Sequence, residues 1–96
     1  MGIDDLIKGK REDILRIAAK HGAYNVRIFG SFARGDAGPE SDVNLLVDAG
    51  ANTSSWFPAG LKLDLEELLG RYVRIATEKG LYWYIKARVM EEAIPL

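Results

Sequence analysis

The segment at 42–48, DVNLLVD, places the tightest limit on the fold of this chain. Its middle is apolar at consecutive positions, which predicts a strand that is buried on both faces. The chain has only 96 residues, so it can build one modest core around that strand. We therefore expect a single domain spanning residues 1–96.

Two further short patterns favour strands, and three longer patterns favour helices. The strand patterns lie at 25–30 and 72–77, and the helical patterns at 3–22, 61–69 and 81–93, with Pro95 ending the last helix. Between them, SFARG at 31–35 can form a short helix at most. This alternation predicts an α/β (α+β) fold, in which a small mixed β-sheet of at least three strands packs against helices.

Charge and composition exclude several classes of function. The chain has 13 Lys and Arg against 14 Asp and Glu, a net charge of -1, which argues against bulk nucleic-acid binding. Cysteine is absent and His21 is the single histidine, which excludes disulfides, cysteine-ligated metals and a His–His metal pair within one chain. No apolar run approaches the ~20 residues of a membrane span. We expect a soluble, cytoplasmic domain without a membrane partner.

The stretch GSFARGDAGPESDVN at 30–44 carries the most information about chemistry. Gly30 permits close approach of a ligand, and Ser31 offers a hydroxyl where backbone N–H groups are free to bind phosphate. Asp42 stands at the start of the buried strand. A Gly-Ser pair alone is most often a turn with a helix cap, and an aspartate alone is most often a turn residue. The combination of strand, Gly-Ser, ten residues and Asp-x-Asn is much rarer.

This combination resembles the motif of the minimal nucleotidyltransferases of the DNA polymerase β superfamily, which is Gly-Ser, ten residues, Asp-x-Asp. Gly30 and Ser31 match its start, residues 32–41 supply the ten, and Asp42 matches the first aspartate. The resemblance continues through LEELLGR and TEKGL to the terminal EEAIPL. It implies a nucleotidyltransferase (DNA polymerase β-like) fold and the transfer of a nucleoside monophosphate from a triphosphate to a hydroxyl.

The resemblance also implies a ligand set. In the family, two aspartates on one strand face and a third acid from a neighbouring strand hold two Mg²⁺ ions against ATP or another triphosphate. Nucleotide binding would fall to Gly30, Ser31, Arg34 and Ser41. Taken alone, Arg34 is more typical of a solvated surface residue, and Ser41 of a hydrogen-bonding loop residue.

This sequence departs from the family pattern at two catalytic positions. Asn44 stands where the second aspartate is expected, and Arg74 stands where the third acid is expected. The nominal charge of Asp42, Asn44 and Arg74 is therefore 0 instead of -3. At an effective dielectric of about 20, this difference removes on the order of several kcal/mol of attraction for a dication. We expect Asp42 and Asn44 to face the Gly30 turn, Arg74 to lie near Asp42, and the metal site at Asp42 to be weak or absent.

Other acids could replace the missing ones. Asp64 and Glu66 are candidates. However, LKLDLEELLG is the pattern of an amphipathic helix, in which acids most often form the solvated face. Asp48 shares a strand face with Asn44 but lies about 13 Å further along, too far for the same metal site.

Four aromatic side chains fall in the last third of the chain: Tyr72, Tyr82, Trp83 and Tyr84. On the last helix the row Leu81, Ile85, Val89 can face the core. Since consecutive helical residues are about 100° apart, the three aromatics cannot all join that row. They form either an interface or a local lid over the sheet edge.

The sequence leaves several functions open. One is a nucleotidyltransferase that belongs to a toxin–antitoxin pair, with a HEPN-type helical partner that it modifies with AMP, as the resemblance implies. The loss of the acids at Asn44 and Arg74 predicts that its two-metal catalysis is impaired. The alternative is a non-catalytic module that binds a partner or forms a homo-oligomer through the C-terminal aromatic region. An engineered chain is a third reading of the missing acids.

Overall fold

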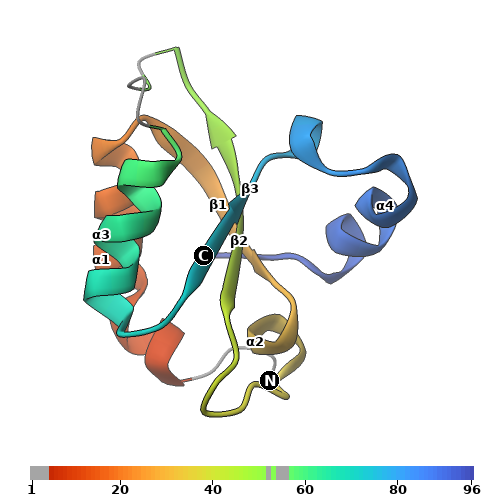
Figure 1. The fold of residues 1–96 in the computed structure, drawn as a ribbon, viewed down its shortest axis with the longest axis horizontal. Coiled ribbons are helices and arrows are strands. Elements are labelled where there is room, and N and C mark those ends of the chain that lie inside the picture. Colours follow the sequence, from red (N-terminus) through yellow and green to blue (C-terminus); the bar gives the residue numbers. More distant parts are fainter. Residues whose placement is uncertain (1–4, 52, 54–56) are drawn as a thin grey trace.

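The computed structural model describes residues 5–51, 53 and 57–96, and these contain a four-stranded mixed β-sheet with helices on its two sides (Figure 1). The elements in chain order are α1 (Asp5–Lys20), β1 (Ala23–Phe29), α2 (Ser31–Arg34), β2 (Val43–Ala49), α3 (Ala59–Leu69), β3 (Val73–Ala76), the 3-10 helix η1 (Glu78–Gly80), α4 (Trp83–Glu92) and β4 (Ile94–Pro95). Every expected helix and strand is present, with ends that differ by one or two residues. Residues 3 and 4 of the first predicted helix lie outside the described residues.

The sheet has the strand order β3-β2-β1-β4, so the apolar strand β2 is central, as its composition predicts. It pairs antiparallel with β1 and parallel with β3, which confirms the expected mixed sheet. No pattern in the sequence predicted β4, because a two-residue strand carries no readable alternation. Pro95, which was expected only to end a helix, sits instead on this edge strand, where a residue without an N–H is tolerated.

One face of the sheet packs on α1 and α3, which lie side by side (Figure 1). The core there is formed by alternate residues of the central strands and by the inner rows of both helices: Ile7, Ile14, Ala18, Val26, Ile28, Val43, Leu45, Val47, Leu61, Leu65, Leu69 and Val73. Leu46 has no exposed surface either, and strand alternation places it on the opposite face. The prediction that β2 is buried on both faces is therefore confirmed.

The last helix, α4, lies across the sheet from α1 and α3 (Figure 1). Of its residues only Val89 is buried, so the predicted row Leu81, Ile85, Val89 faces the body of the domain with just one fully covered side chain. Trp83 is 86% exposed, and both neighbouring tyrosines are exposed as well. The lid interpretation of these aromatics is wrong, because none of the three packs over the sheet edge. Among the described helices, none is long and apolar enough to cross a membrane.

The core assignment predicts unequal effects for two leucines of α3. Leu65 is 0% exposed, so Leu65→Ala should lower the free energy of unfolding by about 2–5 kcal/mol through lost burial and a residual cavity. Leu63 is 63% exposed in the same helix, and Leu63→Ala should change that free energy by less than about 0.5 kcal/mol. Urea unfolding followed by circular dichroism measures both, and equal losses would contradict the packing described here.

Candidate functional site

The Gly-Ser pair forms a tight turn between β1 and α2. Gly30 has φ 80°, a left-handed conformation that favours glycine, and α2 begins directly after it at Ser31. A Cβ atom on Gly30 would lie 2.7 Å from the side-chain nitrogen of Asn44. Phe29 pairs with Asn44 across β1 and β2, so the turn packs directly against the second position of the Asp-x-Asn motif.

Asp42 and Asn44 lie at the start of β2, next to Arg74 of β3. Asn44 and Arg74 are partners in the parallel β2–β3 register. The Arg74 Nε atom donates a hydrogen bond to Asp42 Oδ2 over 3.0 Å, so the contact expected from the sequence is present. Both side chains reach solvent, with Arg74 65% and Asp42 33% exposed. An arginine therefore neutralises the carboxylate that matches the first aspartate of the family motif.

The donor set at this place does not suit two divalent ions. Asp42 supplies one carboxylate, Asn44 supplies a neutral amide oxygen, and Arg74 supplies a permanent positive charge. Mg²⁺ prefers carboxylate oxygens and phosphates. Among the described residues no group of three or more His, Cys, Asp or Glu side chains could hold a metal ion.

The two acids of α3 that could have replaced the missing carboxylates are engaged elsewhere. Asp64 contacts His21 Nε2 at 2.7 Å, and the hydrogen bond to His21 is the main cause that lowers the pKa of Asp64. Glu66 accepts hydrogen bonds from Lys62 Nζ and the Val73 N–H, which lower its pKa in that order. These contacts tie α3 to α1 and to β3, so both acids serve packing.

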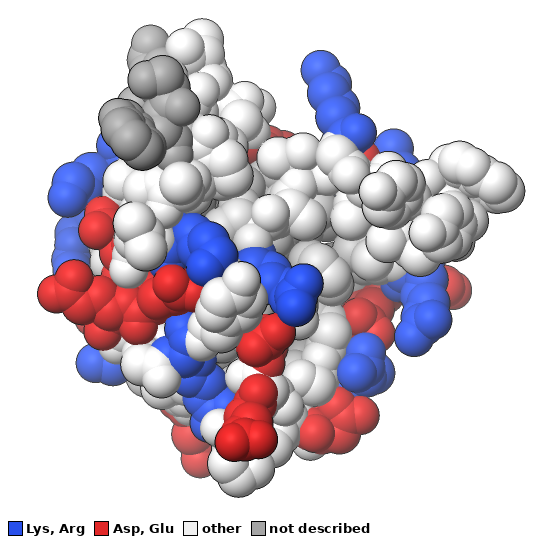
Figure 2. Space-filling model, in the orientation of Figure 1, with Lys and Arg blue, Asp and Glu red and all other residues white. Residues whose placement is uncertain are grey.

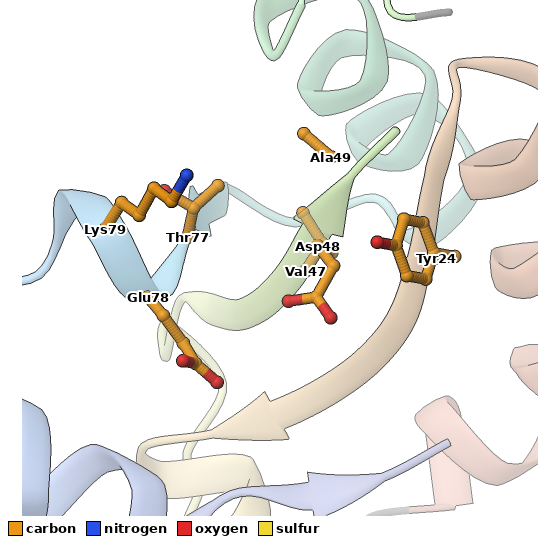
Figure 3. A pocket seen from close by; sticks show the side chains of 7 residues that line it. All are labelled: Tyr24, Val47, Asp48, Ala49, Thr77, Glu78 and Lys79. Carbon is orange, nitrogen blue, oxygen red and sulfur yellow. The ribbon is translucent and has the colours of Figure 1, made fainter. Parts of the chain in front are cut away.

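Asp48 likewise belongs to a different cluster. Arg27, only 7% exposed, donates to Asp48 Oδ1 over 2.9 Å and to Glu78 Oε1 over 3.2 Å. Asp48 and Glu78 also line a cavity of about 330 Å³ at the far end of β2. Figure 3 shows its lining residues, which are Tyr24, Val47, Asp48, Ala49, Thr77, Glu78 and Lys79. Six residues of extended strand, about 20 Å, separate Asp48 from Asp42, so this cavity is not part of the Gly30 site.

The remaining predicted nucleotide-binding residues, Arg34 and Ser41, already have partners. Arg34 Nη1 donates to Glu92 Oε1 over 2.9 Å, and Arg34 Nε donates to Asp36 Oδ2 over 3.4 Å. These hydrogen bonds, that of Glu92 first, raise the pKa of Arg34. Ser41 Oγ accepts the Gly38 N–H over 2.7 Å and so shapes the loop before β2, as its alternative interpretation predicted.

One residue at this turn could not be predicted from its sequence pattern. Glu92, at the end of α4, accepts the Gly30 N–H over 2.7 Å as well as the Arg34 guanidinium. It lies 62 residues from Gly30 in the chain, and nothing in its local pattern indicates the contact. Its only sequence signal was its place in the terminal EEAIPL segment that resembles the family.

Gly-Ser at the end of one strand and Asp-x-Asn at the start of its antiparallel neighbour define the class of protein, that of the nucleotidyltransferase fold. The nucleotidyltransferase domain family matches residues 10–96, and the chain belongs to this family.

Individual relatives agree with that assignment. The chain is 36% identical over 84 residues to a protein of Methanocaldococcus jannaschii assigned as a protein adenylyltransferase, a match that covers 88% of this chain and 90% of that protein. A second protein of that organism with the same assignment is 33% identical over 78 residues, 78% of each chain.

Solved structures give the same picture. One described as a minimal nucleotidyltransferase is 45% identical, with a TM-score of 0.84 over 97% of both chains. A toxin–antitoxin structure with AMP-PNP has a TM-score of 0.74 at 16% identity, covering 88% of this chain and 69% of that chain. At that identity the second likeness shows the shared fold alone.

The Gly30 turn predicts a specific sensitivity to substitution. Gly30→Ala should lower the free energy of unfolding by more than about 2 kcal/mol, because the glycine-only combination of φ 80° and ψ -155° adds to a clash with Asn44. Gly70 is the comparison: it has the left-handed helical φ 67° and ψ 24° with nothing within 4 Å of an added Cβ, so Gly70→Ala should cost only that strain, about 1–2 kcal/mol. Thermal and urea unfolding of both variants measure the difference, and equal costs would contradict both the backbone constraint and the clash at Gly30.

Proposed function

We propose that this nucleotidyltransferase-family domain is impaired in two-metal nucleotidyl transfer and acts mainly by binding a partner protein. The observation that carries the proposal is the Asp42–Arg74 ion pair, 3.0 Å long, at the position where family members hold metal. Arginine binds a carboxylate through a planar, permanently charged group, so its positive charge faces Asp42 at every physiological pH.

Coulomb's law gives the size of the metal-binding free energy that the missing acids would have supplied. Each unit charge at about 4 Å is worth about 4 kcal/mol at an effective dielectric of about 20. The nominal site charge of 0 at Asp42, Asn44 and Arg74 thus lacks the attraction that three acids would supply, although solvent at the exposed Arg74 reduces the figure. We therefore propose that Mg²⁺, which the family uses, binds weakly here.

Nucleotide binding can persist without tight metal binding. We propose that ATP, or another triphosphate, contacts the turn formed by Gly30, Ser31 and Arg34, with Ser41 shaping the adjacent loop. The close packing of the turn against Asn44 and the cationic Arg34 beside it support this site. A structural neighbour that was solved with AMP-PNP is consistent with a nucleotide ligand.

The proposal predicts the effect of restoring the acids. In the unaltered chain, isothermal titration calorimetry should find that Mg²⁺ does not tighten the binding of ATP relative to metal-free ATP. Asn44→Asp combined with Arg74→Asp should create a metal-dependent site, because it removes the cation and adds two carboxylates. Either single change should do less, since one retains the cation and the other leaves a single amide beside Asp42.

Arg11→Asp provides the charge control, since Arg11 is an exposed arginine on α1, which covers the face of the sheet opposite Asp42 and Asn44. It should leave Mg-ATP binding unchanged. Tight Mg-ATP binding with turnover by the unaltered chain would refute the impairment and favour active adenylyl transfer, the activity assigned to the two archaeal relatives.

The partner surface that we propose is the outer face of α4. Trp83, Ala87 and Met90 form an exposed apolar row at i, i+4 and i+7, the spacing with which a helix fits a groove. From Lys79 to Met90 the chain carries three basic residues and no acidic one. In Figure 2 the tip of the molecule at α4 is white, whereas basic and acidic groups alternate over the middle of the same face.

A partner that fits this helix would present an apolar groove with acidic residues at its rim. We propose that it is the toxin of a toxin–antitoxin pair, of the HEPN-type helical class, which the toxin–antitoxin structure with the same fold supports. The balanced charge and the lack of cysteine are consistent with our proposal of a cytoplasmic location.

Self-association through the same helix is a second candidate, favoured by the three clustered rings. Tyr82 and Tyr84 stack with centroids 5.7 Å apart, and Trp83 meets Tyr84 edge-on at 5.9 Å. We expect a homo-oligomer in sedimentation velocity at high concentration, and Trp83→Ala should shift it to monomer. Tyr24→Ala, at an aromatic that is 58% exposed on β1, is the control and should leave the oligomer intact. A strictly monomeric unaltered chain would leave α4 to the partner alone.

A further inference from the structure

The position of Glu92 follows from strand register. In the antiparallel β1–β4 pair, Arg27 lies opposite Pro95 and Ile28 opposite Ile94. Continuing this register by two residues places Glu92 opposite Gly30. The backbone is helical at Glu92, where α4 ends, so no strand bond forms there. The Glu92 side chain reaches across instead, and its Oε2 accepts the Gly30 N–H over 2.7 Å.

The second oxygen of the same carboxylate binds the far end of the turn. Glu92 Oε1 accepts Arg34 Nη1 over 2.9 Å. Gly30 precedes α2 and Arg34 is its last residue, so one carboxylate spans the four-residue helix with Ser31 between its two contacts. Two charge-assisted hydrogen bonds of this length are among the stronger polar contacts of a protein.

The carboxylate is well enclosed and ionised. Its side chain is only 18% exposed. Burial by itself would raise the pKa of Glu92, but the hydrogen bonds from Arg34 and from the Gly30 N–H outweigh burial and lower it. Because Ile94 and Pro95 are paired to β1 directly after it, the carboxylate is held at the turn by the chain that follows.

We propose that Glu92 is a positioning residue, which holds the Gly30–Arg34 turn in the shape that presents Ser31 and Arg34 to a triphosphate. The nucleotide part of this inference rests on the function proposed above. The opposing possibility is that Glu92 competes with phosphate for Arg34. The two roles depend on different properties of Glu92: positioning of the turn depends on the length of the side chain, and competition with phosphate depends on its negative charge.

Two conservative variants separate reach from charge. Glu92→Asp keeps the charge and shortens the side chain by one methylene, so it cannot span Gly30 and Arg34 together. Glu92→Gln keeps the length and an oxygen that accepts the Gly30 N–H, but removes the charge. Glu91→Asp and Glu91→Gln, at the exposed neighbouring glutamate, are the matched controls.

The first readout needs no nucleotide. Amide hydrogen exchange of Gly30, followed by NMR, should be about tenfold faster in Glu92→Asp, because a hydrogen bond to a charged group is lost. In Glu92→Gln it should stay within about twofold of the unaltered chain, since the acceptor remains. The second readout is the dissociation constant for metal-free ATP by calorimetry, which should rise about fivefold in Glu92→Asp.

Each other outcome has a defined meaning. Unchanged Gly30 exchange in Glu92→Asp would overturn the positioning role. Tighter ATP binding in Glu92→Gln, without weaker binding in Glu92→Asp, would overturn it in favour of competition. If the unaltered chain binds no ATP while Gly30 exchange still responds to Glu92→Asp, the proposed nucleotide site fails, and Glu92 retains its assignment as the residue that holds the turn.

Discussion

Burial of β2 on both faces is the constraint on which the rest of the structure depends. Val43, Leu45 and Val47 have no exposed surface beneath α1 and α3, and Leu46 has none on the opposite face. Since side chains alternate along a strand, this orientation commits Asp42 and Asn44 to the face away from those helices. The polar positions of the motif are therefore placed by hydrophobic packing of the residues between and after them.

The open face of β2 carries an arginine–carboxylate pair at each end, and the two pairs have different physical weights. Arg27 is almost fully buried between Asp48 and Glu78, so removing either acid would leave a charge poorly solvated, and this cluster fastens η1 to the sheet. Arg74 is mostly exposed beside Asp42, where an ion pair contributes little net stability. The Arg27 cluster is therefore suited to stabilise the fold, whereas the Asp42–Arg74 pair can be broken with a small loss in the free energy of unfolding.

The C-terminal fourteen residues connect the exposed aromatic rings to the glycine turn. One end of α4 carries the exposed rings, and its last residue, Glu92, contacts the Gly30 turn. The two-residue β4 then fixes the chain to β1. A protein that binds the outer face of α4 would therefore contact a helix whose last residue is hydrogen-bonded to the turn next to Asn44.

Local patterns in the sequence were sufficient for much of this protein. The central strand, the helices, the glycine turn and the position of Arg74 beside Asp42 could be predicted, the last through the family motif. Local patterns work because strand alternation and helical periodicity are properties of neighbouring residues. The family resemblance adds the expectation that Arg74 of the third strand lies near Asp42, which no local pattern contains, whereas the full strand order comes from the structure.

Only the tertiary structure decided which distant side chains meet. Three hydrogen bonds join residues that are far apart in the chain. They are Glu92 with Gly30, separated by 62 residues, Arg27 with Glu78, separated by 51, and His21 with Asp64, separated by 43. β4 was likewise invisible, because two residues form a strand only when a neighbouring edge is present to pair with. In each case the sequence determined the chemistry of the side chain, and the packing of the sheet and helices determined its partner. The physical reason is that a charged side chain pairs with the donor or acceptor that the folded backbone places within hydrogen-bond distance, and that placement depends on residues far away in the chain.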